Sequence, residues 1–312
     1  MKKENVLYMV IPCYKEEAVL PETARRLRAK MTALIEEGKI AGNSRVLFVN
    51  DGSSDRTWAL IEELHGQDPL FSGVNLSRNR GHQNAVLAGL MTAVQYADMM
   101  ISMDADLQDD VNAIDKMVDA YHAGNDVVYG VRARRDTDTF FKRFTAESFY
   151  RLLKMMGVEI VFNHADFRLM SRRAVEGLAQ FKEVNLFLRG IVPQIGYPWT
   201  TVSYDRAERF AGESKYPLKK MLALAFDGVT SFSVKPLRLI VGCGVAALAA
   251  ALVLLIWALC AGSGSLAGIG SLWLLGGVQL TALGVVGEYV GKVYGETKAR
   301  PRFIIERVIN DP

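Results

Sequence analysis

Short apolar runs alternate with longer amphipathic segments through the first part of the chain. The apolar runs predict β-strands over residues 6–11, 46–49, 73–76, 99–103 and 126–129. Between them, apolar residues recur at three- and four-residue steps, which predicts helices over residues 18–37, 55–65, 82–96 and 111–123. Because strands that alternate with helices build βαβ units, the pattern predicts an α/β fold with a mostly parallel sheet.

A different pattern occupies the region near the C-terminus, where residues 239–287 contain no Asp, Glu, Lys or Arg. A Gly262-Ser263-Gly264-Ser265 turn divides this tract into residues 239–261 and 266–287, each about 33 to 35 Å long as a helix. A hydrocarbon core is roughly 30 Å thick, so we expect a hairpin of two transmembrane helices. The alternative is a pair of buried helices in a large soluble core, although such helices rarely run so long without a charge.

Basic residues flank the charge-free tract on both sides, whereas the turn within it is neutral. They are Lys215, Lys219, Lys220, Lys235 and Arg238 before the tract, and Lys292, Lys298, Arg300 and Arg302 after it. The positive-inside rule therefore predicts that both termini lie in the cytoplasm. Gly287, Gly291 and Gly295 have the spacing for close helix packing, as in a homo-oligomer, but glycine is common in membrane helices generally.

The composition narrows the class of protein further. The chain has 312 residues, of which 50% are hydrophobic and 23% charged, and this excludes both a disulfide-held miniprotein and a disordered chain. Its net charge of +3 is too small to indicate binding to nucleic acid. The three cysteines lack metal-type spacing and do not form a disulfide framework. Pro12 and Lys15 interrupt the first apolar run, so we do not expect it to be a signal peptide. We therefore expect the bulk of the chain to be cytoplasmic.

Polar residues follow the first two predicted strands, at the edge where a parallel sheet binds its ligands. The first strand ends in Pro12-Cys13-Tyr14-Lys15-Glu16-Glu17, and the second in Asn50-Asp51-Gly52-Ser53-Ser54-Asp55. A carboxylate there can accept hydrogen bonds from a nucleobase or a ribose, but a plain turn and helix cap would use the same residue types. Neither a Gly-x-x-x-x-Gly-Lys-Ser/Thr loop nor a Gly-x-Gly-x-x-Gly follows the first strand, which weakens the ATPase and dinucleotide interpretations.

The fourth predicted strand ends in an acidic segment, Asp104-Ala105-Asp106-Leu107-Gln108-Asp109-Asp110. Carboxylates at positions i and i+2, beside further oxygen ligands, suit a hard divalent cation that bridges a diphosphate. A solvated acidic loop that caps the next helix is the alternative.

Five motifs, in this order, resemble family 2 glycosyltransferases of the GT-A fold. They are Pro12-x-Tyr14-x-Glu16, Asn50-Asp51-Gly52-Ser53-Ser54-Asp55, Ser77-Arg78-Asn79-x-Gly81, Asp104-Ala105-Asp106-Leu107-Gln108 and Arg209-x-x-Gly212-x-Ser214-Lys215. The resemblance covers nearly the whole chain and is closer to the polyprenyl-phosphate glycosyltransferases related to dolichyl-phosphate mannose synthase and to bacterial bactoprenol glucosyltransferases. This chain has Arg80 where those relatives often have an aromatic residue.

The resemblance implies a Rossmann-like GT-A domain that binds a nucleotide sugar. It implies that the nucleoside is held by Pro12, Tyr14, Glu16, Val49 and Asp51, with Asp104 and Ala105 beside the ribose. It also implies Mg²⁺ or Mn²⁺ on Asp106 and Gln108, and a catalytic set of Asp106, Arg132, Asp166, Arg209 and Lys215. Arg209 and Lys215 would also contact the donor diphosphate, while Arg132 and Arg143 would contact the lipid phosphate; for Arg143, surface charge is the alternative.

The sequence leaves more than one role open for two residues near these motifs. Asp166 resembles an acceptor-side residue of the family, where it would orient a sugar hydroxyl or the acceptor, but a structural pairing with Arg168 explains it nearly as well. His82 begins a predicted helix and could approach the donor phosphates.

The organisation implied by the resemblance has four parts. They are a cytoplasmic catalytic domain over residues 1–213, an amphipathic interfacial segment over 214–238, two transmembrane helices over 239–288 and a cytoplasmic basic tail over 289–312. Within the tail, residues 300–305 are basic and apolar, as in a strand or an interfacial tail. Residues 140–156 and 216–232 mix aromatic residues, leucines and lysines as interfacial helices do, although ordinary core helices are the alternative.

The resulting functional hypothesis is inverting transfer of a hexose to undecaprenyl or another polyprenyl phosphate at the bacterial cytoplasmic membrane. The bacterial resemblance favours UDP-glucose as the donor, while GDP-mannose, UDP-galactose and an N-acetylhexosamine donor stay open. One rival is a processive polysaccharide synthase of the same superfamily, which usually carries a Gln-x-x-Arg-Trp motif and more membrane spans, neither found in this sequence. The other is a noncatalytic membrane module that binds nucleotide or lipid.

Overall fold

The computed structural model describes residues 5–132, 164–184, 186–205 and 264–310, together with scattered helical residues between 240 and 257. The chain divides into two compact units. One unit comprises Met1–Ser148, Ile160–Lys215 and Pro301–Pro312, and the other comprises Phe149–Glu159 and Tyr216–Arg300.

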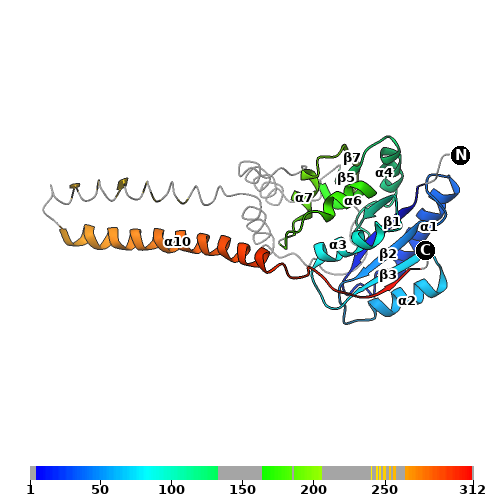
Figure 1. Cartoon of the computed structure of the whole chain (residues 1–312), viewed down its shortest axis with the longest axis horizontal. Coiled ribbons are helices and arrows are strands. Elements are labelled where there is room, and N and C mark those ends of the chain that lie inside the picture. Colours follow the sequence, from blue (N-terminus) through cyan, green and yellow to red (C-terminus); the bar gives the residue numbers. More distant parts are fainter. Residues whose placement is uncertain are drawn as a thin grey trace. The chain divides into compact units, whose positions relative to one another are not determined.

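The first unit is built on a sheet that contains eight strands within the described residues (Figure 1). Their bounds are β1 Leu7–Cys13, β2 Arg45–Asn50, β3 Phe71–Leu76, β4 Met99–Ser102, β5 Val127–Arg132, β6 His164–Ser171, β7 Trp199–Tyr204 and β8 Ile305–Ile309. The strand order is β7-β5-β6-β4-β1-β2-β3-β8. β1 pairs in parallel with β2 and β4, β2 with β3, and β5 with β7, whereas β6 and β8 pair antiparallel with their neighbours. The predicted α/β fold with a mostly parallel sheet is confirmed.

Helices connect most of the strands of this unit. Their bounds are α1 Leu20–Glu36, α2 Thr57–Gln67, α3 His82–Ala93, α4 Ala113–His122, α6 Arg172–Ala179 and α7 Leu188–Gln194. All seven residues of β1 are buried, as in a central strand that is covered on both faces. α1 is amphipathic, and Pro21 in its first turn is compatible with a helix start because the N–H that proline lacks has no partner there.

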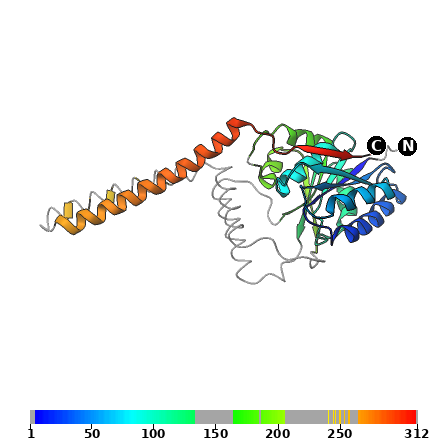
Figure 2. The ribbon, with the colours of Figure 1, turned by 90° about the horizontal axis from the view of Figure 1, so that it is seen from below.

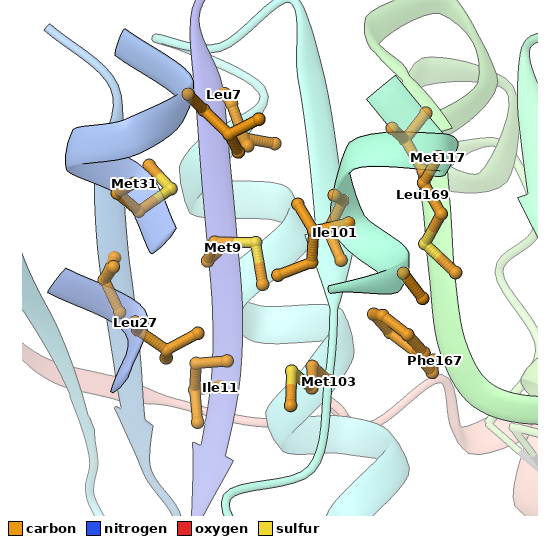
Figure 3. Packing of buried hydrophobic residues seen from close by; sticks show 14 of the residues in the cluster. Leu7, Met9, Ile11, Leu27, Met31, Ile101, Met103, Met117, Phe167 and Leu169 are labelled. Atoms are coloured by element: carbon orange, nitrogen blue, oxygen red, sulfur yellow. The ribbon is translucent and has the colours of Figure 1, made fainter. Parts of the chain in front are cut away.

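The core lies on both faces of the central strands. Figure 3 shows Leu7, Met9 and Ile11 of β1 in one cluster with Leu27 and Met31 of α1. The alternate side chains of β1 point to the opposite face. There α3 approaches so closely that a Cβ at Gly89 would lie 2.3 Å from Val10 and 2.7 Å from Val49. Because helices cover both faces of the sheet, a ligand can bind only at the edge formed by the carboxyl ends of the parallel strands.

The last strand comes from the segment that we expected to be a basic tail, residues 289–312. β8 pairs antiparallel with β3, and Figures 1 and 2 show it in red at the end of the chain. Asn310, the next residue, accepts hydrogen bonds from the hydroxyls of Ser72 (2.7 Å) and Tyr8 (3.3 Å). This part of the tail therefore belongs to the sheet of the first unit.

The second unit contains α10, Gly264–Lys298, drawn in orange and red in Figure 2. Among the residues that the structure describes, one stretch, Leu274–Lys298, is long and apolar enough to cross a membrane by length and composition. The helix continues beyond the expected second span, 266–287. The first span, 239–261, lies largely outside the described residues, and the interfacial segment 214–238 lies wholly outside them, so the two-helix hairpin stays a prediction.

Candidate active site

The loops that follow β1, β2 and β3 are joined by hydrogen bonds at the carboxyl edge of the sheet. The backbone N–H of Lys15 donates to Ser53 Oγ at 3.0 Å, and that of Glu16 donates to Thr57 Oγ1 at 3.0 Å. The N–H of Asp51 donates to the carbonyl of Cys13 at 2.9 Å. The first two sequence motifs are therefore held side by side, as a shared nucleoside site requires.

Asp51 connects this pair of loops to the third. Its buried carboxylate, 2% exposed, accepts hydrogen bonds from the backbone N–H groups of Arg80 at 2.7 Å and Gly81 at 2.9 Å. Burial raises the pKa of Asp51, and these two hydrogen bonds offset only part of that rise. Each carboxylate oxygen has a further lone pair, so Asp51 can organise the loop and still accept a hydrogen bond from a ligand.

Gly52 allows the loop after β2 to pack closely against the loop after β3. Its φ is +60°, and a Cβ at this position would lie 2.4 Å from the carbonyl carbon of Arg78. Any other residue would meet backbone there and adopt a disfavoured conformation. The glycine of the second motif is thus required by the approach of the third motif.

The other residues implied for the nucleoside differ in what their side chains can offer. Tyr14 is 38% exposed and Glu16 is partly exposed, so both side chains can reach a ligand. Pro12 and Val49 are buried, and Val49 faces α3. Pro12 and Val49 can therefore contribute only backbone groups and shape.

The acidic segment after β4 forms a tight turn. Leu107 is buried and has a φ of +57°, a left-handed conformation that is unfavourable for leucine. The backbone N–H of Gln108 donates to Asp106 Oδ1 at 3.2 Å, while Thr23 Oγ1 donates to the carbonyl of Ala105 at 2.8 Å. This arrangement leaves the side chains of Asp106 and Gln108 partly exposed on the same turn.

The charges around this turn fit a divalent cation. Burial is the largest cause of the raised pKa of Asp104, and the neighbouring carboxylates of Asp166 and Asp106 add to it, while His82 lowers it. Asp106 and Gln108 supply hard oxygen donors of the kind that Mg²⁺ and Mn²⁺ prefer. Within the described part of the chain, no three His, Cys, Asp or Glu side chains are grouped to hold a metal by themselves.

Asp166 on β6 is held by two arginines. Its carboxylate accepts hydrogen bonds from Arg168 Nη2 at 2.9 Å and from Arg189 Nε and Nη2 at 3.1 and 2.9 Å. Burial alone would raise the pKa of Asp166, but Arg189 and Arg168 outweigh it and hold that pKa well below its usual range. The structural pairing with Arg168, which was one of the two interpretations from the sequence, is present, and Arg189 is a partner that the sequence did not indicate.

His82, in the first turn of α3, lies close to two of these acids. Its Nε2 atom is 3.5 Å from Asp104 Oδ1 and 3.8 Å from Asp166 Oδ2. The histidine therefore belongs to the site, between the strand end that carries the acidic turn and the Asp166 cluster.

The charge of Arg132 also acts on the acidic turn. This arginine is the last residue of β5 and is in register with Tyr204 of β7. Tyr204 donates a hydrogen bond from its hydroxyl to Asp109, whose pKa is raised to about 6, first by burial and then by the charge of Asp104, while Arg132 opposes that rise. Asp109 is part of the acidic segment, but the sequence predicted no role for it or for Tyr204.

The structure thus brings most of the implied residues to one edge of the sheet. Those it places there are Pro12, Tyr14, Glu16, Val49, Asp51, Asp104, Ala105, Asp106, Gln108, Arg132 and Asp166. Arg143, Arg209 and Lys215 lie outside the described residues, as do residues 140–156 and 216–232.

The sequence of the chain is similar to those of known proteins. Residues 8–178 match the family model Glycosyl transferase family 2, and the chain belongs to that family. It is 49% identical over 313 residues to an uncharacterized glycosyltransferase, YkoT, of Bacillus subtilis (strain 168), covering 98% of this chain and 92% of that protein. It is 38% identical over 308 residues to a prophage bactoprenol glucosyl transferase homolog of Escherichia coli (strain K12), covering 96% and 98%.

A solved structure is also similar, the mannosyltransferase PcManGT from Pyrobaculum calidifontis in complex with GDP-Man and Mn²⁺. The TM-score is 0.46 at 15% identity, with 96% of this chain and 86% of that chain covered. The family resemblance that the five sequence motifs indicated is confirmed by the family match and by the full-length relatives.

Proposed function

We propose that this protein transfers a hexose from a nucleotide sugar, preferably UDP-glucose, to undecaprenyl or another polyprenyl phosphate at the cytoplasmic face of a bacterial membrane. The observation that carries the proposal is the 38% identity to a bactoprenol glucosyl transferase homolog over nearly the full length of both chains. The gathering of the donor-side motifs at one sheet edge and the apolar stretch Leu274–Lys298 support it.

On the donor side, Tyr14, Glu16 and Asp51 bind the nucleoside, with Pro12 and Val49 shaping the backbone around it and Asp104 and Ala105 beside the ribose. Asp106 and Gln108 would hold Mg²⁺ or Mn²⁺, because both supply the hard oxygen donors that these cations prefer. When bound, the cation supplies positive charge that stabilises the departing nucleoside diphosphate. Arg132, Arg209 and Lys215 would add positive charge that stabilises the two anionic substrates, and Arg132 and Arg143 would contact the lipid phosphate.

The chemical step is a direct displacement at the anomeric carbon. An oxygen of the acceptor phosphate forms the new bond while the bond to the donor β-phosphate breaks, and the nucleoside diphosphate leaves with that electron pair. Attack from the face opposite the leaving group inverts the anomeric configuration. A phosphate monoester has a second pKa of about 6 and is largely dianionic at neutral pH, so the nucleophile needs no general base.

Asp166 acts in this mechanism by orientation. A carboxylate whose pKa is held far below its usual range is a weak proton acceptor, and three hydrogen bonds from Arg168 and Arg189 already occupy it. Its charge fixes the guanidinium of Arg189 and lies 3.8 Å from His82 Nε2, so Asp166 can hold both side chains in place within the site. We therefore assign Asp166 a positioning role rather than proton transfer.

The proposed location is the bacterial cytoplasmic membrane, with two spans and with the catalytic domain and both termini in the cytoplasm. The bilayer and a second copy of the chain, through the glycines of the last helix, are proposed partners. Two other functions remain as alternatives, a processive polysaccharide synthase and a noncatalytic module that binds nucleotide or lipid.

A donor screen tests the proposal. The purified full-length chain in detergent would be mixed with undecaprenyl phosphate and, in turn, UDP-glucose, GDP-mannose, UDP-galactose and UDP-N-acetylglucosamine, while nucleoside diphosphate release is measured. We expect release only when both the lipid and Mg²⁺ or Mn²⁺ are present, fastest with UDP-glucose. Release that does not depend on the lipid, or none with any donor, would contradict the proposal.

A further inference from the structure

The C-terminal strand is irregular at one position. β8 follows α10 after residues 299–304 and pairs with β3, with Asn75 opposite Arg307 and Leu76 opposite Ile305. Two neighbouring residues of β3 thus face two residues of β8 that are separated by Glu306, which makes Glu306 the extra residue of a β-bulge. Bulges redirect a side chain and are frequent beside active sites.

The redirected side chain begins a series of hydrogen bonds. Asn75 Nδ2 donates to Glu306 Oε2 at 2.9 Å, and Asn50 Nδ2 donates to Asn75 Oδ1 at 2.7 Å. The backbone N–H of Ser53 donates to Asn50 Oδ1 at 3.2 Å, and Ser53 Oγ accepts from the N–H of Lys15 at 3.0 Å. The series therefore runs from the tail to the loops after β2 and β1, where the donor nucleoside is proposed to bind.

The chemistry of Glu306 sets the direction of this series. An ionised carboxylate only accepts hydrogen bonds, whereas an asparagine amide has a donating and an accepting end. Glu306 therefore requires Asn75 to turn its Nδ2 atom toward the tail and its Oδ1 atom toward Asn50. Asn50, 2% exposed, must then present its own Oδ1 atom to the backbone N–H of Ser53.

A second connection reaches the same corner independently. The backbone N–H of Ser77 donates to the carbonyl of Ile304 at 3.0 Å, so the tail also contacts the start of the loop after β3. In that loop, the N–H groups of Arg80 and Gly81 donate to Asp51. The tail is thus connected to Asp51 both through its neighbour Asn50 and through the loop that holds its carboxylate.

We propose that Glu306 is a positioning residue for the donor nucleotide: its carboxylate fixes the two asparagine amides and thereby the loops after β1 and β2. Through this residue the segment that follows α10 sets the affinity for the nucleoside diphosphate portion of the donor. The proposal rests on the proposed function, because it assumes that these loops bind the donor.

The test exchanges the donor and acceptor at the first hydrogen bond. Asn75→Asp keeps an oxygen that can accept from Asn50, but it places a second carboxylate against Glu306, and repulsion between the two carboxylates displaces the side chain at position 75 from Asn50. Glu306→Gln in the same chain restores one donor and one acceptor. UDP binding with Mg²⁺ would be measured by calorimetry, and the KM for the donor and kcat by the transfer assay. We expect Asn75→Asp to raise the Kd for UDP and the donor KM about two- to tenfold, the range that one net hydrogen bond supports, with kcat changed less than about twofold.

The double variant Asn75→Asp, Glu306→Gln should return both values to within about twofold of the wild type, since the hydrogen bond is restored with its direction reversed. Arg307→Ala is the matched control, because Arg307 lies next to Glu306 but pairs with Glu62 on α2. It should leave the UDP affinity unchanged. Should Asn75→Asp not fold, Glu306→Lys changes an exposed residue only and should weaken UDP binding to the same extent.

The outcomes separate the two proposals. A wild-type chain that binds no nucleotide and transfers no sugar from any donor overturns the proposed function. Wild-type binding of UDP that Asn75→Asp and Glu306→Lys leave unchanged, or a loss that Glu306→Gln does not restore, overturns the positioning role of Glu306 alone. A fall in kcat with an unchanged UDP affinity overturns it as well.

Discussion

Asp109 gives the sharpest stability prediction because it is buried and carries a perturbed charge. It is 6% exposed, and burial, with Asp104 as the second cause, raises its pKa from 3.8 to about 6. An acid whose pKa is raised in the folded state supports folding below its unfolded pKa, and this support is lost as the pH rises through the folded pKa. The protein should therefore lose stability between about pH 4 and pH 7 through this group.

The magnitude follows from the shift. A change from 3.8 to about 6 corresponds to about 3 kcal/mol in the free energy of unfolding once Asp109 is fully ionised. Asp109→Asn removes the charge and keeps an oxygen that accepts the hydrogen bond from the Tyr204 hydroxyl. The variant should be more stable than the wild type by up to about 3 kcal/mol at pH 8, by about half of that at pH 5 and by little at pH 4.

Thermal unfolding of the detergent-solubilised chain, with a chelator to remove divalent cations, measures this difference between pH 5 and pH 8. For a unit of this size, we expect Asp109→Asn to raise Tm by roughly 6 to 12 °C at pH 8. Asp110→Asn is the control, because Asp110 is partly exposed, and it should change Tm little. An Asp109→Asn variant that is less stable than the wild type at pH 8, or that gains the same stability at both pH values, would contradict a raised pKa for Asp109.

Two further predictions concern the chemical step and the membrane topology. Asp166→Asn should lower Tm, because it leaves the buried Arg168 without its carboxylate. It should still retain appreciable transfer, and the fall in rate at acid pH should still follow ionisation of the acceptor phosphate near pH 6. A loss of several orders of magnitude with both substrates bound normally would make Asp166 essential in the chemical step. A cysteine at Ser263, in a chain with Cys243 and Cys260 changed to serine, should react with membrane-impermeant thiol reagents applied outside intact cells; labelling only after the cells are opened would show that the hairpin is inverted or does not span.

Five of the eight strands in the described sheet could be predicted from the sequence because they are continuous apolar runs. β1 to β5 coincide with the five predicted segments, as expected for strands whose burial is set by local composition. β6 was missed because the polar side chains of Asp166 and Arg168 interrupt its pattern, although their pairing lets Arg168 be buried. β7 and β8 are edge strands with exposed residues, so their hydrophobic pattern is weak.

The sequence predicted those site residues that belong to local motifs. Asp51, Asp104 and Asp106 follow strand ends, and the topology of a parallel sheet brings such ends together. The contacts that set their charge join residues distant in sequence, such as Tyr204 with Asp109 and Arg189 with Asp166. Because a single sequence contains no record of which distant residues meet, these partners required the structure.

The most direct test of the account is the identity of the lipid product formed from UDP-glucose and undecaprenyl phosphate. Mass spectrometry and NMR of the purified lipid should show one hexose attached to the phosphate, with the β configuration that inversion of an α-linked donor gives. An α-linked product would contradict direct displacement. A lipid that carries a chain of sugars, or UDP released without any glycosylated lipid, would contradict single hexose transfer to polyprenyl phosphate.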